Sequence, residues 1–148
     1  MEKTCFFIGH RDAPESVFPG LAHAVEQHIV DNGVSTFVVG RYGRFDGMAA
    51  RAVKEAKKRH AEVHLLYLRP YHPAERPDET PDGFDGSLYP PGMERVPRRL
   101  AIVRANRYMV DHCDFLIAYA YRPGNSRKLL EYARRREQRG FMQVTAIE

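Results

Sequence analysis

Three short polar segments follow apolar runs of this sequence and carry side chains that could bind an anion. The first is Gly9-His10-Arg11, which comes directly after the apolar run at residues 4–8. Glycine lets a backbone turn sharply or approach a ligand closely, and arginine presents a planar fork that suits a phosphate group. We interpret the segment either as an anion-binding loop or as a tight turn at Gly9 with Arg11 paired to a surface acid.

The second segment, residues 40–46, holds two glycines and two arginines and leads into an amphipathic stretch. Free N–H groups at a helix N-terminus favour bound anions, so Gly40, Gly43 and Asp46 are candidate ligand-binding residues. Asp46 can instead act as the N-cap of the helix. The spacing matches neither G-x-G-x-x-G nor a P-loop, and G-K-[ST] does not occur in the chain. This argues against a dinucleotide-dependent oxidoreductase and a P-loop ATPase.

The third segment contains Gly124, Asn125 and Ser126, and Ser126 is a suitable N-cap for the helix that follows. On the second turn of that helix lies Glu131, which the spacing alone assigns to the surface.

A further helix carries two polar residues where its pattern calls for apolar ones. Asn106 and Arg107 interrupt the expected buried stripe of Leu100, Val103 and Val110. Polar groups in a buried stripe need partners, and a ligand is one such partner. The alternative is an arginine that reaches solvent at the rim.

Histidines and cysteines give no sign of a metal or nucleophile site. His60 and His64 are four residues apart but straddle the end of a helix and the start of a strand. Cys5 and Cys113 lie in apolar runs without C-x-x-C spacing, which predicts reduced, buried thiols. We expect no bound metal and no other cofactor.

The elements that position these segments alternate between short apolar runs and helical stripes, which is typical of a parallel α/β sheet. We predict a single Rossmann-like domain over residues 1–148, in three layers, with a five-stranded, mainly parallel sheet flanked by four helices. The predicted strands are residues 4–8, 36–39, 63–68, 115–119 and 143–147. Ligands bind outside the carboxyl ends of such strands, where the three polar segments lie.

One long segment breaks this alternation. Residues 69–97 hold seven of the ten prolines and almost no helical or strand pattern. Ordered loops of this length are uncommon in compact domains and are usually functional or mobile. The segment is either a lid over the site or a cover for an edge of the sheet.

Composition and charge bound the class of protein. Hydrophobic residues make up 43% and charged residues 28% of the 148, which is typical of a globular chain. No apolar run approaches the roughly 20 residues of a membrane span, and the first residues do not form a signal peptide, so we expect a cytoplasmic protein. The net charge is +4, and between Arg95 and Arg139 basic residues outnumber acidic ones twelve to four. This favours an anionic partner, unless the arginines only form a solvated helix face.

Taken together, the chain resembles small bacterial proteins of the SLOG superfamily. This Rossmann-like group includes the Lonely Guy phosphoribohydrolases and the DprA/Smf DNA-processing proteins. The resemblance spans nearly the whole chain and rests on four stretches. They are G-H-R at 9–11, G-R-F-D-G-M at 43–48, the helix pattern from Pro97 to Asp114, and G-N-S-R-K-L-L-E-Y-A at 124–133.

The resemblance implies a site for a nucleotide or nucleotide-derived molecule, most simply in a non-catalytic sensor or accessory protein. Lonely Guy enzymes carry P-G-G-x-G-T-x-x-E before and within the last helix, and their Glu serves the cleavage of a base from a ribose 5′-monophosphate. Glu131 falls at that position and is the candidate catalytic residue of an N-glycosidase alternative. Asn125, Arg127 and Lys128 replace the second glycine, the third glycine and the threonine, and the two basic residues could meet phosphate by charge. DprA-like nucleic-acid binding is a second alternative, and a homodimer is a further implication.

Overall fold

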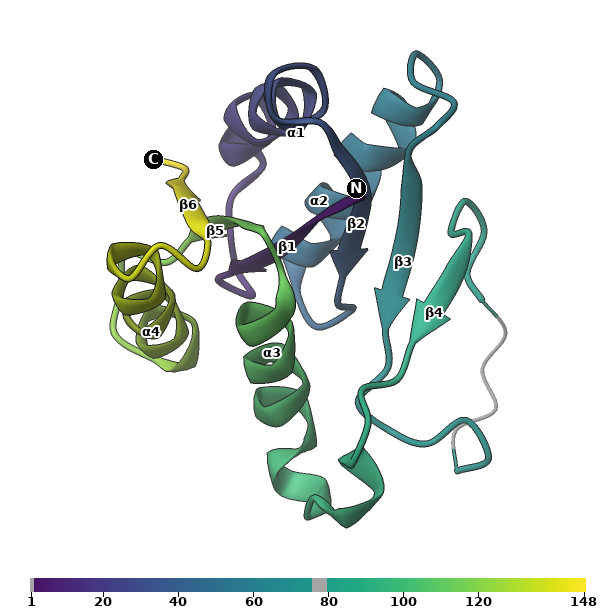
Figure 1. The fold of residues 1–148 in the computed structure, drawn as a ribbon, viewed down its shortest axis with the longest axis vertical. Coiled ribbons are helices and arrows are strands. Elements are labelled where there is room, and N and C mark those ends of the chain that lie inside the picture. The colour runs from purple at the N-terminus through teal and green to yellow at the C-terminus, as the bar shows by residue number, and fades with distance from the viewer. Residues whose placement is uncertain (1, 76–79) are drawn as a thin grey trace.

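In the described residues, six strands form one parallel sheet in the spatial order β4-β3-β2-β1-β5-β6 (Figure 1). The computed structural model describes residues 2–75 and 80–148. The predicted α/β class with a parallel sheet is confirmed, whereas the predicted number of five strands is wrong. The strands are β1 (Lys3–Gly9), β2 (Val34–Val39), β3 (His64–Leu68), β4 (Gly86–Leu88), β5 (Phe115–Tyr119) and β6 (Gln143–Ala146).

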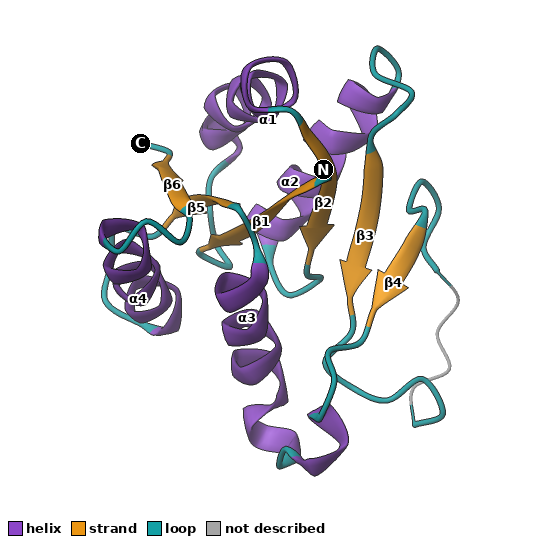
Figure 2. Ribbon diagram, viewed as in Figure 1, coloured by secondary structure: helices purple, strands orange, loops and turns teal. Residues whose placement is uncertain are grey.

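Four α-helices of the described residues cover the sheet, two on each face (Figure 2). Phe7 of β1 packs in the buried cluster of α1 and α2, while its neighbour Phe6 packs in the cluster of α3 and α4. A strand buried on both faces requires a continuous apolar run, which β1 has. Within the described residues, no helix has the length and apolar character needed to cross a membrane. The helices are α1 (Phe18–Asn32), α2 (Arg44–Lys57), α3 (Ala101–His112) and α4 (Asn125–Gln138).

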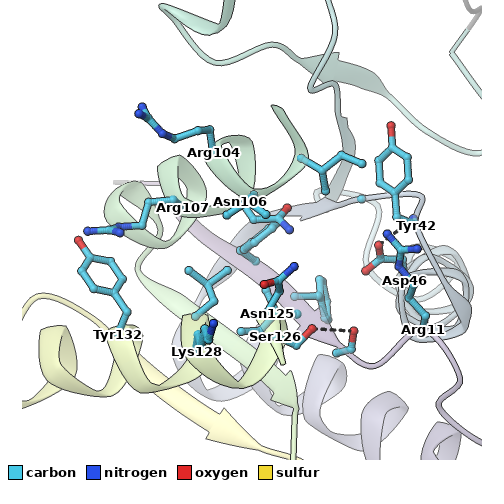
Figure 3. A pocket seen from close by; sticks show the side chains of 18 of the residues that line it. Arg11, Tyr42, Asp46, Arg104, Asn106, Arg107, Asn125, Ser126, Lys128 and Tyr132 are labelled. Carbon is cyan, nitrogen blue, oxygen red and sulfur yellow. Dashed lines mark hydrogen bonds between the residues drawn. The ribbon is translucent and has the colours of Figure 1, made fainter. Parts of the chain in front are cut away.

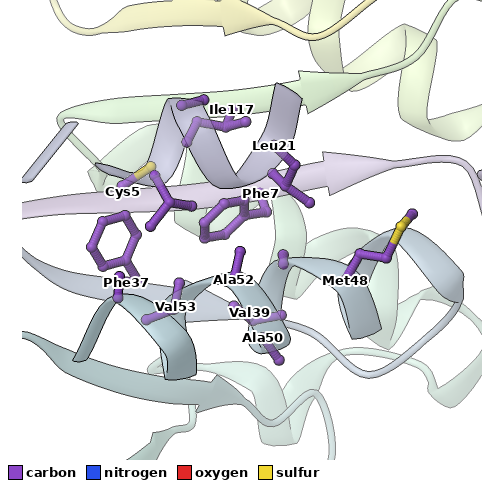
Figure 4. Packing of buried hydrophobic residues seen from close by; sticks show 14 of the residues in the cluster. Cys5, Phe7, Leu21, Phe37, Val39, Met48, Ala50, Ala52, Val53 and Ile117 are labelled. Atoms are coloured by element: carbon purple, nitrogen blue, oxygen red, sulfur yellow. The ribbon is translucent and has the colours of Figure 1, made fainter. Parts of the chain in front are cut away.

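The core between the sheet and α2 is closely packed (Figure 4). The rings of Phe7 and Phe37 stack across β1 and β2, with their centroids 5.9 Å apart. The inward face of α2 carries small side chains, and Ala52 and Val53 are buried against this layer. Small side chains on this face let the helix approach the sheet, which fixes where the N-terminus of α2 lies relative to the end of β1.

β4 is the strand that the sequence pattern did not predict. It lies at the edge of the sheet, inside the Pro-rich segment, and pairs with β3 in the register Leu66↔Gly86. The N–H of Asp85 donates to the carbonyl of Leu65 at 2.8 Å, which starts the pairing. Three residues that include a glycine give no apolar run, so only the pairing reveals the strand. Met93 of the segment is buried in the core. Residues 76–79 of the segment lie outside the described residues.

The buried face of α3 differs from the predicted stripe. Leu100 and Val103 are 39% and 45% exposed, so of the predicted stripe only Val110 is buried. Alanines one turn apart bring the helix close to the sheet, and the larger apolar side chains are displaced to its flank. The residues of α3 that are buried are Ala101, Ala105, Met109 and Val110.

Candidate functional site

A cavity of about 600 Å³ opens at the carboxyl ends of β1 and β2, between α2, α3 and α4 (Figure 3). After β4 the chain crosses to the other side of β1 and forms β5, so the direction of the crossovers reverses at β1. Ligands of open α/β sheets bind at such a reversal. The cavity therefore lies where the fold rule places a ligand.

The structure brings most of the predicted ligand-binding residues together around this cavity. They come from the ends of β1 and β2, from the middle of α3 and from the start of α4, which are far apart in the sequence. His10, Gly43, Gly124 and Glu131 are not among the residues that line it. Those that do are Gly9, Arg11, Gly40, Asp46, Asn106, Arg107, Asn125 and Ser126.

Helices α2 and α4 start in the same way, with a glycine N-cap and no side-chain cap. Gly43 and Gly124 have φ angles of 147° and 146°, a region that L side chains rarely adopt. The predicted N-caps Asp46 and Ser126 are wrong, because each helix begins earlier and both residues fall within its first turn. The first N–H groups of α4 therefore have no side-chain acceptor beside the cavity wall formed by Asn125, an arrangement that favours an anion.

Backbone contacts hold the Arg11 loop against the start of α2. The N–H of Arg44 donates to the carbonyl of Arg11 at 2.9 Å. A Cβ on Gly43 would lie 2.6 Å from the Cα of Arg11, so the close approach requires glycine. The hydroxyl of Ser126 donates to the carbonyl of Gly9 at 3.2 Å and ties α4 to the end of β1. Gly43 and Ser126 thus position the residues on either side of the cavity mouth.

His10 does not line the cavity, and its contacts are with residues of β5 and of the loop that follows it. Its Nε2 accepts the N–H of Arg122 at 3.2 Å, and its ring lies edge-on to Tyr119 and Tyr121. Burial, together with the nearby Arg122 charge, lowers the pKa of the imidazole. A neutral ring that accepts at Nε2 holds the loop after β5 against the end of β1.

The cavity is strongly cationic. Its described lining includes five basic side chains and one carboxylate, that of Asp46. Burial raises the pKa of Asp46 to about 6, against the opposing effects of the Tyr42 N–H and the Arg11 charge. Asp46 is thus mostly ionised at neutral pH, and the lining keeps an excess of positive charge. The basic residues are Arg11, Arg104, Arg107, Lys128 and Arg135.

An aromatic and apolar wall completes the side formed by α3 and α4. The guanidinium of Arg107 lies 3.7 Å from the centroid of the Tyr132 ring, a cation–π contact. The Tyr132 hydroxyl donates to the carboxylate of Asp111, which fixes the ring. Val103 and Leu129 line the same wall. Such a surface, next to several cations, suits a ligand that is anionic and has a planar ring.

Several lining residues were not singled out from the sequence. The lining residues of α4 recur every three or four positions from Asn125 onward. Extending this spacing along the helix would have identified Tyr132 and Arg135. Tyr42 and Arg104 carry no comparable signal, because their position depends on how the β2–α2 loop and α3 meet.

Glu131 lies on a different side of α4. Its side chain is 56% exposed, and its Oε2 lies 3.8 Å from Nε of Arg127. It shares no wall with the cavity. Arg127 also donates to the carbonyl of Tyr121 at 2.8 Å, so of the two basic residues at the start of α4 it is Lys128 that lines the cavity.

No cluster of three or more metal-ligating side chains occurs within residues 2–75 and 80–148. Cys5 and Cys113 are both free and buried, as predicted. Burial raises the pKa of the Cys113 thiol to about 12 and that of Cys5 well above its ordinary value, so neither is a ready nucleophile.

The raised pKa of Asp46 predicts a pH-dependent stability effect. The folded protein binds this proton more tightly than the unfolded chain, whose Asp has the ordinary value of 3.8. The contribution of Asp46 to stability is therefore present below the unfolded pKa and is lost as the pH rises through about 6. Asp46→Asn keeps an acceptor for the Tyr42 N–H and removes the charge, so its Tm should exceed the wild-type Tm at neutral pH. The difference should shrink as the pH falls below the folded pKa.

Thermal denaturation of the two proteins across that pH range checks this prediction. Asp31→Asn, at an exposed position of α1, makes the same change of side chain away from the cavity and is the matched control. A Tm difference for Asp46→Asn that stays constant from neutral to acidic pH would contradict the assignment.

Comparison with known proteins identifies a similar fold but no family. No known protein family matches the chain, and no curated protein is significantly similar to it. Among solved structures, the molybdenum cofactor binding protein from the phototrophic bacterium Rippkaea orientalis is similar, with a TM-score of 0.61 and 13% identity. The match covers 100% of this chain and 78% of that one. At this identity the likeness bears on architecture alone, and it supports the predicted Rossmann-like fold.

Proposed function

We propose that this chain binds a nucleotide or nucleotide-derived small molecule in the cavity at the ends of β1 and β2, as a non-catalytic sensor or accessory protein of the SLOG superfamily. One observation carries the proposal. The cavity combines five basic side chains with the uncapped N-terminus of α4 at the crossover reversal of a parallel sheet. Cations and free N–H groups in this arrangement bind phosphate.

The phosphate site in this proposal lies at the start of α4. Asn125 and Ser126 present the first turn of the helix to the cavity, and Lys128 follows one turn on. Lys128 stands where Lonely Guy enzymes have threonine, and it supplies charge where their loop supplies close backbone approach. The replacement of glycines by Asn125 and Arg127 is compatible with binding by charge.

The size and the second wall of the cavity support a ligand larger than free phosphate. A volume of about 600 Å³ falls within the range of small-molecule sites, roughly 300–1,000 Å³. The wall of Val103, Leu129 and Tyr132 offers an apolar and aromatic surface that a ligand larger than phosphate can contact. The structural neighbour from Rippkaea orientalis is described as binding the molybdenum cofactor, which supports small-molecule binding as the general class.

The proposal gives Glu131 no catalytic part, because its carboxylate lies beside Arg127 and outside the cavity. Nor does it require nucleic acid. Part of the arginine excess in α4 and at its C-terminal end has intramolecular partners. Arg136 donates to the carbonyl of Asp111 at 3.0 Å, and Arg139 lies 5.3 Å from the Phe141 ring centroid.

A thermal-shift panel of AMP, GMP, ATP, NAD, ADP-ribose, cyclic nucleotides and the molybdenum cofactor tests the proposal. A ligand at about 100 times its Kd adds roughly 2.7 kcal/mol, which raises the Tm of a chain of this size by about 5–10 °C. Arg107→Ala should reduce the shift, because the guanidinium lines the cavity. Arg134→Ala removes an exposed arginine of α4 outside the cavity and should leave the shift unchanged.

A flat panel would contradict the proposal. Duplex DNA binding that falls steeply with salt and ignores Arg107→Ala would instead favour the DprA-like alternative. Release of free base from a monophosphate, lost in Glu131→Gln, would restore the glycosidase alternative.

A further inference from the structure

Asp46 is the one acidic side chain among the described residues that line the cavity. Its carboxylate would repel the phosphate that the five basic residues attract. In an anion-binding cavity, the carboxylate of Asp46 would therefore contact a different part of the ligand from the phosphate, namely a group that donates hydrogen bonds.

Few donors of the described residues reach the Asp46 carboxylate. Its Oδ2 accepts the N–H of Tyr42 at 3.1 Å and lies beside Gly40, where a Cβ would come within 2.9 Å of it. Arg11 acts on it through charge and not through a hydrogen bond. Each carboxylate oxygen can accept two hydrogen bonds, so the group has unused acceptor capacity toward the cavity. Its position there is compatible with a ligand that supplies the missing donors.

The figure places this carboxylate at one end of the cavity. Asp46, Arg11 and Tyr42 lie together on one side, Arg107 and Tyr132 lie on the opposite side, and Asn125 and Ser126 lie between them (Figure 3). A ligand whose phosphate meets the start of α4 would therefore extend toward Asp46 with its remaining polar group.

We infer that Asp46 selects ligands with a 2-amino-4-oxopyrimidine edge, as in guanine, by accepting hydrogen bonds from the ring N–H and the 2-amino group. The inference rests on the proposed function and specifies its ligand class. Two parallel N–H groups match the two carboxylate oxygens, as they do in an arginine–carboxylate pair. Adenine presents a lone pair at N1 instead, which would face the carboxylate and leave its acceptors unpaired.

The alternative partner for Asp46 is a ribose, because in Rossmann-like folds an acidic residue can accept hydrogen bonds from the ribose hydroxyls. The surroundings of Asp46 favour a ring edge. The carboxylate lies in the first turn of α2, beside the Tyr42 side chain, which lines the same end of the cavity. An aromatic side chain next to the acceptor gives a planar base a surface to pack on.

Calorimetric titration of the full chain with GMP, IMP and AMP tests the inference. GMP should bind roughly tenfold to a hundredfold more tightly than AMP, with IMP between them because it keeps the ring N–H and lacks the 2-amino group. Asp46→Asn should lose the preference for GMP and gain affinity for XMP, whose 2-oxo group can accept from the Asn amide. Neopterin monophosphate carries the same edge without a purine, and its affinity relative to GMP distinguishes a pterin from a nucleotide ligand.

The outcomes separate this inference from the proposed function. Equal affinity for GMP, IMP and AMP, unchanged in Asp46→Asn, would overturn the inference and leave nucleotide binding in place. A loss of affinity for 2′-deoxy-GMP that matches the loss in Asp46→Asn would assign Asp46 to the ribose and overturn it as well. No binding of any of these ligands would overturn the inference, whereas no shift with any member of the thermal-shift panel would refute the proposed function itself.

Discussion

Lys128→Glu should weaken the binding of a phosphorylated ligand by roughly a hundredfold. The substitution removes a cation that lines the cavity one turn into α4 and introduces a carboxylate beside the helix N-terminus. The lost charge-assisted hydrogen bond and the new repulsion act in the same direction. The affinity of the best ligand of the thermal-shift panel, measured by calorimetry, checks the prediction.

Arg134→Glu is the matched control, since it makes the same change of charge on the same helix outside the cavity. Its guanidinium lies 4.0 Å from the carboxylate of Glu137 on the exposed side of α4. Affinity should fall far less in this variant. An equal loss in both variants would mean that the general charge of α4, and not the cavity, attracts the ligand.

Gly9→Ala should destabilise the protein by about 3 kcal/mol, which lowers Tm by roughly 6–12 °C. An added Cβ would lie within 2.8 Å of three ring carbons of Phe45. The Phe45 ring is 1% exposed and stacks on Tyr119, so it has little room to move. The glycine that sequence analysis assigned to a ligand loop is thus required by the packing of α2 against β1.

Gly47→Ala makes the same chemical change with the opposite expected sign. Nothing lies within 4 Å of an added Cβ at Gly47, which is an exposed position of α2. Alanine should stabilise the helix by about 0.5–1 kcal/mol. Thermal denaturation of both variants checks the pair, and a Gly9→Ala protein as stable as the wild type would contradict the packing argument.

The N-termini of α2 and α4 show which features the local sequence pattern predicts and which depend on the tertiary structure. Sequence pattern located the polar loops after β1, β2 and β5 correctly, because a buried parallel strand must be apolar and its loop polar. It misassigned the caps, since Asp46 and Ser126 have good capping side chains in the wrong register. Gly43 and Gly124 start the helices earlier, with backbone angles that no residue pattern specifies.

The candidate site shows the same division. The polar loops after the strands identified Arg11 and Asn125 as candidates, and the interrupted apolar stripe of a helix identified Arg107. Their convergence depends on the crossover that carries α3 over the sheet and sets β5 beside β1. Tyr42 and Arg104 line the cavity only because of that convergence. Glu131 lies outside it because this residue is on the side of α4 that faces the solvent.

The sequence by itself determined the α/β class, the buried strands and the loops that could bind an anion, because these follow from short-range periodicity and the chemistry of neighbouring residues. Only the tertiary structure decided the short edge strand β4, the buried face of α3 and the side chains that share the cavity. These depend on pairing and packing between residues far apart in the chain, for which a local pattern carries no signal. Asp46 illustrates both. The sequence shows its acidic side chain, but only the fold places that side chain among five basic ones in the cavity lining.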